Sequence, residues 1–157
     1  MSQRSPVATL ATLRRLLLAL LLFGLVGTGT ELILTGHDED VWQFIPLIVL
    51  GMSLVAGFVM SVVITRRLAA STIAIRIFQA TMVLLILSGG LGSLLHYQAS
   101  VEFKREMDPS LNGFALFSSV VQSKAPPTLA PGTLALLGLL GLACVFRLDI
   151  HDRSPNS

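Results

Sequence analysis

Four long apolar stretches dominate the pattern of hydrophobic and polar positions along the chain. They cover about residues 16–34, 44–65, 77–95 and 129–146, and polar segments separate them. At 1.5 Å per residue, roughly 18 to 22 helical residues extend over about 27 to 33 Å, which matches a hydrocarbon layer of about 30 Å. Backbone N–H and C=O groups inside that layer must bond to each other, so each stretch is predicted to be a transmembrane helix.

Two other interpretations of these stretches fit less well. A cleaved signal peptide has an apolar run of about 7–15 residues, which is shorter than residues 16–34, so this stretch is expected to remain as an anchor. Helices of a soluble bundle would each carry a polar stripe, but residues 16–26 and 82–87 are apolar on all sides. The predicted fold class is all-α: a polytopic integral membrane protein with four transmembrane helices in a bundle, and a single membrane domain over residues 1–157.

The composition supports a membrane protein and excludes several other classes. The chain is 53% hydrophobic and 13% charged, with a mean hydropathy of +0.78, whereas soluble domains contain about 25% charged residues. Its one cysteine, Cys144, excludes an internal disulfide and a cysteine-cluster metal site. The basic residues form no dense stripe, so nucleic acid is not expected as a partner.

Basic residues gather on one side of the predicted membrane. With four spans, both termini share a side with the loop at residues 66–76, and that side holds eight arginines, whereas the other side holds three basic residues. This asymmetry predicts cytoplasmic termini and, for a bacterial chain, the inner membrane. Seven of the nine acidic residues lie on the outer side, which leaves the outer face at −4 and the inner face at +6.

The segment between the third and fourth stretches is predicted to be a long outer loop, residues 96–128, with one or two short amphipathic helices. Residues 101–108 show helical spacing that Pro109 interrupts. Residues 111–121 carry apolar side chains at near-helical spacing, which is typical of a helix that lies in a membrane interface. The aromatic side chains predicted to anchor the protein at the outer interface are Trp42, Tyr97, Phe114 and Phe117.

Glu31 is a candidate for moving a proton or an ion. It lies about three residues inside the outer end of the first stretch, and an ionisable group within a span is a candidate functional site. A carboxylate this close to the end can also extend to the interface. Four spans with a glutamate in the first resemble the small multidrug transporters, and this resemblance implies an ion- or proton-coupled transporter. The chain departs from that pattern in its long outer loop and in the position of Glu31 near the end of its span.

Histidines and acids on the outer side form a second candidate site. His37 and Asp38 follow the first stretch, and His96 ends the third, so they are expected at the same membrane level. Neutral imidazole together with carboxylates suits Zn, Mn, Fe or Cu. The alternative is a solvated anionic face, because the spacing matches no metal-binding motif. The sequence assigns no cofactor.

Small residues recur along the spans at helical spacing. Helices in lipid associate by close van der Waals packing, which small side chains permit. Packing within one bundle is the main interpretation, and docking of a neighbouring subunit is the alternative. The residues predicted to pack are Ser53, Gly57, Ser61, Ser88, Gly92, Gly138 and Gly141.

These features predict a non-catalytic accessory, assembly or stabilising subunit of a larger bacterial membrane complex of the respiratory or photosynthetic type. The sequence has no G-x-S-x-G, H-E-x-x-H or P-loop motif, so enzyme activity is not expected. The expected partners are membrane lipid, other membrane subunits and a cationic outer-side protein that the anionic face would attract. The alternatives are a transporter that uses Glu31 and an outer-face metal-binding protein that uses His37 and His96.

Overall fold

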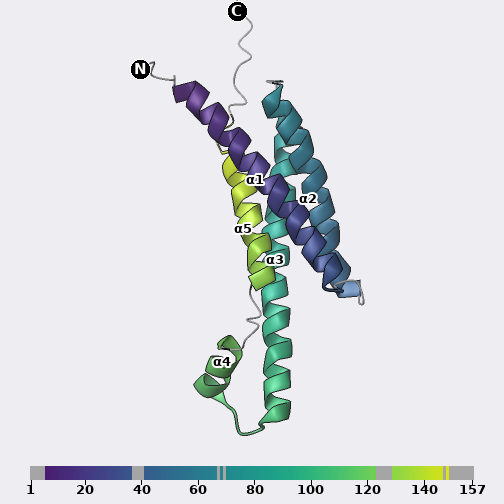
Figure 1. The fold of residues 1–157 in the computed structure, drawn as a ribbon, viewed down its shortest axis with the longest axis vertical. Coiled ribbons are helices and arrows are strands. Elements are labelled where there is room, and N and C mark those ends of the chain that lie inside the picture. Colours follow the sequence, from purple (N-terminus) through teal and green to yellow (C-terminus); the bar gives the residue numbers. More distant parts are fainter. Residues whose placement is uncertain are drawn as a thin grey trace, which may run out of the picture.

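The computed structural model describes residues 6–36, 41–66, 68, 70–122, 129–146 and 148. This part of the chain forms five helices: α1 (Pro6–Leu34), α2 (Val41–Thr65), α3 (Thr72–Met107), α4 (Gly113–Val121) and α5 (Leu129–Cys144) (Figure 1). The regular secondary structure of the described residues is therefore all α-helix, as predicted. Three helices, α1, α2 and α3, are long and apolar enough to cross a membrane, so the first three stretches are helical as predicted.

The fourth apolar stretch forms a shorter helix than predicted. α5 has 16 residues, which corresponds to about 24 Å of helix. After Cys144 the chain continues as a turn, in which the N–H of Phe146 donates to the carbonyl of Ala143 at 3.3 Å. The predicted end at residue 146 is thus two residues too late for the helix. α5 is apolar, but it is shorter than the three helices that can span a bilayer by length.

α3 continues beyond the predicted end of the third span at residue 95. It is one uninterrupted helix of 36 residues, about 54 Å long, so the prediction of a separate helix at residues 101–108 is wrong. The stretch from residue 96 to residue 107 contains no Gly or Pro, and backbone bonding therefore continues although the side chains become polar. The helix ends at Asp108, which is extended (φ −144°, ψ 94°) because it precedes Pro109.

A hydrogen-bonded turn reverses the chain after α3. The Asp108 carboxylate accepts bonds from the Oγ and the N–H of Ser110, at 2.6 and 3.0 Å. These two bonds hold the pKa of the Asp108 carboxyl below its usual value, with the hydroxyl as the larger cause. The N–H of Leu111 also donates to the carbonyl of Asp108 at 3.2 Å. Asp followed by Pro is favoured at the first two positions of such a turn.

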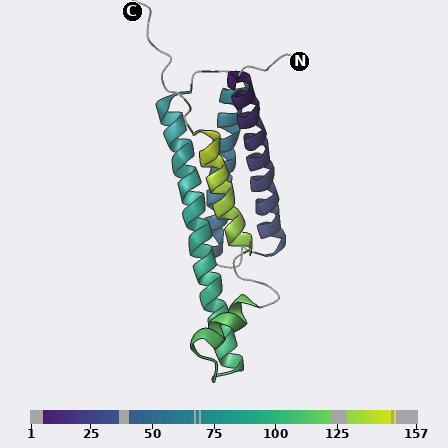
Figure 2. The same cartoon turned by 90° about the vertical axis from the view of Figure 1, so that its left-hand side faces the viewer.

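α4 folds back beside the end of α3, as Figures 1 and 2 show. A helix was predicted at residues 111–121, and α4 covers Gly113–Val121 of this segment. Gly113 has φ +54°, in the left-handed region that glycine adopts without a steric penalty. The chain therefore turns sharply enough for α4 to contact the helix that precedes it.

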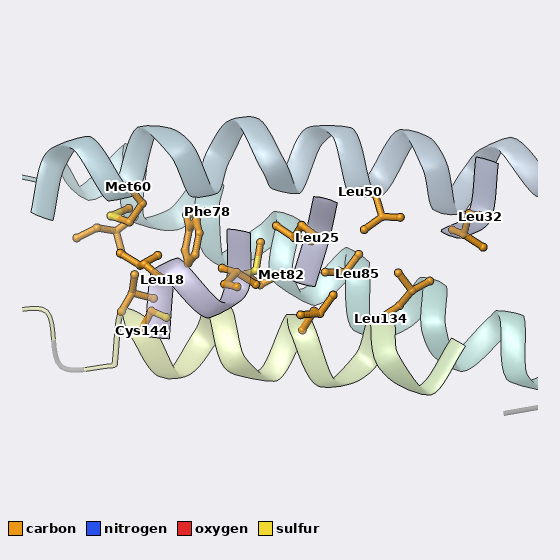
Figure 3. Close-up of a cluster of buried hydrophobic side chains, with 14 residues drawn as sticks. Leu18, Leu25, Leu32, Leu50, Met60, Phe78, Met82, Leu85, Leu134 and Cys144 are labelled. Carbon is orange, nitrogen blue, oxygen red and sulfur yellow. The ribbon is translucent and has the colours of Figure 1, made fainter. Parts of the chain in front are cut away.

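The other four helices pack side by side, and helices that touch run in opposite directions (Figures 1 and 2). α1 contacts α2 and α5, and α3 contacts the same two helices. An apolar core lies between them, shown in Figure 3. From one end to the other, its labelled members are Leu18, Met60, Phe78 and Cys144, then Leu25, Met82 and Leu85, then Leu32, Leu50 and Leu134.

The outward sides of these helices are apolar as well. Phe23 on α1 is 80% exposed, and Leu87 on α3 is 61% exposed. A water-soluble helical protein covers such a surface with polar side chains. Apolar residues on both the inner and the outer sides of α1, α2 and α3 are what a hydrocarbon surrounding requires.

Candidate functional sites

Glu31 lies on the outward side of α1. Its side chain is exposed, whereas Thr28 and Leu32, on the same helix, are buried. The backbone carbonyl of Glu31 accepts a bond of 2.8 Å from the Oγ1 of Thr35 near the helix end. The structure thus places the Glu31 carboxylate away from the packed contacts between α1, α2 and α5.

The predicted metal ligands are not brought together in the described part of the chain. His96 lies on the exposed surface of α3, where its carbonyl accepts a bond of 2.8 Å from the Oγ of Ser100. His37 and Asp38 lie outside the described residues. Among the described residues, no three His, Cys, Asp or Glu side chains form a group that could hold a metal ion. The metal site stays a prediction.

α3 and α5 approach each other closely at the backbone, and glycines on both helices permit this contact. A Cβ on Gly89 would collide with the carbonyl of Pro131 and lie 2.8 Å from the backbone nitrogen of Ala135. A Cβ on Gly138 would lie 2.6 Å from the carbonyl oxygen of Met82. Ordinary Cβ contacts are 3.4 Å or longer. Each helix therefore fits against the backbone of the other only because a side chain is missing at these positions.

Three other glycines predicted to pack, Gly57, Gly92 and Gly141, lie against neighbouring helices. A Cβ on Gly57 would lie 3.1 Å from the Cδ2 of Leu22, and one on Gly92 would lie 3.3 Å from the Cβ of Pro131. Gly141 lies against the side chain of Met82, and Ser61 and Ser88 are partly buried.

Gly24, which with Thr28 is the small-residue position of the first apolar stretch, also lies at a close contact: a Cβ there would lie 2.5 Å from the Cδ2 of Leu137. Gly89 is missing from the set of predicted packing residues. The signal for Gly89 was present in the sequence. Gly89 and Gly92 have the same three-residue spacing as Gly138 and Gly141; the first pair lies against residues 131–135 of α5, and the second against residues 82–86 of α3.

Ser53 is a polar residue in the apolar core. It is fully buried on α2, and its Oγ has no hydrogen-bond partner among the described residues. Thr81, which is buried on α3, instead donates its Oγ1 to the carbonyl of Phe78 at 2.8 Å. An unsatisfied buried hydroxyl typically costs about 1–3 kcal/mol, so Ser53 is a local weakness in the packing of α2.

Two arginines near the start of α1 bond to the C-terminal ends of its neighbours. The Nη2 of Arg14 donates to the carbonyl of Phe146 at 2.9 Å, and the Nη2 of Arg15 donates to the carbonyl of Thr65 at 3.5 Å. The last carbonyls of a helix have no partner within the helix, and they carry its negative dipole end. Besides orienting the chain, these arginines therefore tie α1 to the last residue of α2 and to the turn that follows α5.

Aromatic rings connect α3 and α4. The ring centroids of Tyr97 and Phe117 are 6.3 Å apart, and those of Phe114 and Phe117 are also 6.3 Å apart. Three of the four predicted interface anchors thus lie in one row at the junction of these helices. The fourth anchor, the side chain of Trp42, lies outside the described part of the structure.

Comparison with protein-family models gave no match, and neither did comparisons with curated proteins and with solved structures.

Proposed function

We propose that the chain is a non-catalytic accessory, assembly or stabilising subunit of a larger bacterial membrane complex of the respiratory or photosynthetic type. The observation that supports this most is the interior of the helix packing. Leucine, methionine and phenylalanine side chains fill it, and the buried polar residues of the described chain are Thr28, Ser53 and Thr81. A path for an ion or a polar substrate needs ionisable or polar groups along it, whereas close apolar packing suits a structural role.

The proposal includes a four-helix transmembrane bundle in which α5 is the fourth span. α5 is about 6 Å shorter than a hydrocarbon layer of about 30 Å, a mismatch that local thinning of the bilayer can accommodate at modest cost. Its close contact with α3 and the bond from Arg14 to Phe146 hold it beside helices that are long enough to span. The arginine-rich ends of α1, α2 and α5 would face the cytoplasm of a bacterial inner membrane.

The end of α3 would then be an arm on the outer side. α3 is about 54 Å long, and a whole bilayer with its headgroups measures about 40–45 Å. Glu102 and Glu106 are exposed on this end, one helical turn apart. A cationic domain of an outer-side partner would be attracted to such a surface, and the attraction would weaken with salt.

The test is purification from the native membrane in mild detergent, followed by measurement of complex size and subunit stoichiometry. We expect a larger complex with a fixed subunit ratio, and we expect Glu102→Lys combined with Glu106→Lys to release an outer partner. Glu31→Gln is the matched control, since it removes an exposed acid from a different helix. Recovery of the chain alone, together with ion flux that Glu31→Gln abolishes, would contradict the proposal and favour the transporter.

A further inference from the structure

α4 has two apolar faces, and α3 covers only one of them. Leu116 and Val120 are buried where α4 contacts α3. Phe114 is 82% exposed, and Phe117 and Val121 are each 49% exposed. At 100° per residue, Phe114, Phe117 and Val121 lie within about 60° of one another around the helix. They form an outward apolar face, which we call the Phe114 face.

Two independent estimates place this face at the outer membrane interface. Gly92 on α3 lies at the level of Pro131 in the first turn of α5, and Tyr97 is five residues, about 7.5 Å, further along α3. Counting from exposed Arg76 at the other end of α3, a hydrocarbon layer of about 30 Å takes about 20 residues and ends near residue 96. The ring of Phe117 is 6.3 Å from that of Tyr97. The Phe114 face is therefore at headgroup depth.

The residues along α3 change in the order that a membrane interface requires. Leu91, Leu94 and Leu95 are exposed just before Tyr97. Lys104 and Arg105 follow about two turns after it and are at least partly exposed. Aromatic side chains prefer the level between acyl chains and headgroups, and cationic side chains prefer the level of the phosphates. The Phe114 face thus lies near the level at which the exposed leucines of α3 end, and the cations follow further along α3.

We propose that the Phe114 face binds phospholipid, with Phe114, Phe117 and Val121 inserted at the boundary between headgroups and acyl chains of the outer leaflet. This inference depends on the proposed transmembrane placement of α3. The charge-free sequence of α4 suits this environment, since inserting it desolvates no ionised group. α4 then fixes the depth of α3 in the membrane, and the long α3 end is held at a constant height above the surface.

Tryptophan fluorescence of the full-length protein in phosphatidylcholine vesicles tests this assignment. In a Trp42→Phe background, single tryptophans are introduced by Phe114→Trp or by Phe117→Trp. Ala115→Trp is the matched control, because Ala115 is exposed on α4 but lies about 200° around the helix from Phe117. Leu87→Trp reports the middle of α3, where the side chain is exposed toward the proposed lipid.

We expect lipids brominated near the glycerol end of their chains to quench the tryptophans at 114 and 117 several-fold more strongly than the one at 115. Aqueous iodide should show the reverse order. Equal access of iodide to positions 114 and 115 would overturn the inference. Protection of position 114 from both quenchers would also overturn it, because protein would then cover the face. If Leu87→Trp is not quenched by lipids brominated deep in the acyl chain, the transmembrane placement itself fails.

Discussion

The contact between α3 and α5 makes one quantitative prediction, because two adjacent glycines of α3 have opposite surroundings. A methyl group on Gly89 would collide with the carbonyl of Pro131 and lie 2.8 Å from the nitrogen of Ala135. A methyl group on Gly90 would have nothing within 4 Å. Gly89→Ala and Gly90→Ala therefore change the same helix by the same atoms and differ only in what the new Cβ meets.

The magnitude follows from that difference. To reach an ordinary contact of 3.4 Å from the present 2.8 Å, α3 and α5 must separate by at least about 0.6 Å, and backbone atoms cannot rotate away as a side chain can. Overpacking of this kind costs about 1–3 kcal/mol. The gain in helix propensity from Gly to Ala, about 1 kcal/mol, is common to both variants and cancels. Gly89→Ala should therefore be about 1–3 kcal/mol less stable than Gly90→Ala.

Cys144 supplies the assay. It is the only cysteine of the chain, and it is buried on α5, so a maleimide reaches it only when α5 separates from its neighbours. If opening is fast relative to labelling, the labelling rate follows the free energy of opening, and about 1.4 kcal/mol changes it tenfold. Gly89→Ala should thus label at least about fivefold faster than Gly90→Ala. Equal labelling rates for the two variants would refute the close backbone contact.

Three further variants test single features of the structure. Ser53→Ala removes an unsatisfied buried hydroxyl and should raise the free energy of unfolding in detergent by about 1 kcal/mol; a decrease of that size would mean that the hydroxyl has a partner. Arg14→Gln removes the bond to Phe146 and should lower the free energy of α5 opening by about 0.5–1.5 kcal/mol, seen as faster Cys144 labelling; an unchanged rate would show that the bond contributes nothing. Gly113→Ala forces a side chain into φ +54° at a cost of about 1–2 kcal/mol, so the amides of α4 should exchange hydrogen faster while those of α2 do not; unchanged exchange in α4 would contradict the strain.

The sequence was sufficient to predict which segments are helical. An apolar run of about 20 residues that crosses a membrane must be helical, and α1, α2 and α3 contain the three predicted runs, although α1 begins ten residues earlier than predicted, at Pro6. Most of the small residues that line the contacts could be found as well, because their spacing along a helix defines a face. Gly89 was missed because Ser88 beside it also lies at helical spacing from Gly92, and the position of α5 shows that Gly89 makes the close contact.

The helix ends were harder to predict, because the hydropathy of a residue indicates whether its side chain prefers lipid or water, and not whether its backbone is helical. α3 continues past residue 95 since nothing in residues 96–107 breaks a helix, although those residues are polar. α5 ends before residue 146 although Val145 and Phe146 are apolar. The hydrogen bonds that Arg14 and Arg15 donate to other helices could not be predicted from the sequence either, because they depend on which chain segments lie beside α1.

The short length of α5 and its close contacts are connected. A helix that ends early in a membrane leaves its last carbonyls nearer to the hydrocarbon, where an unsatisfied polar group costs several kcal/mol. The guanidinium of Arg14 donates to the carbonyl of Phe146, in the turn two residues after α5, at 2.9 Å, and its charge opposes the negative end of the α5 dipole. The glycine contacts with α3 add dispersion energy along a helix that buries fewer residues than a full span. α5 is therefore held in place by its neighbours, and loss of either contact should release it before any other helix separates.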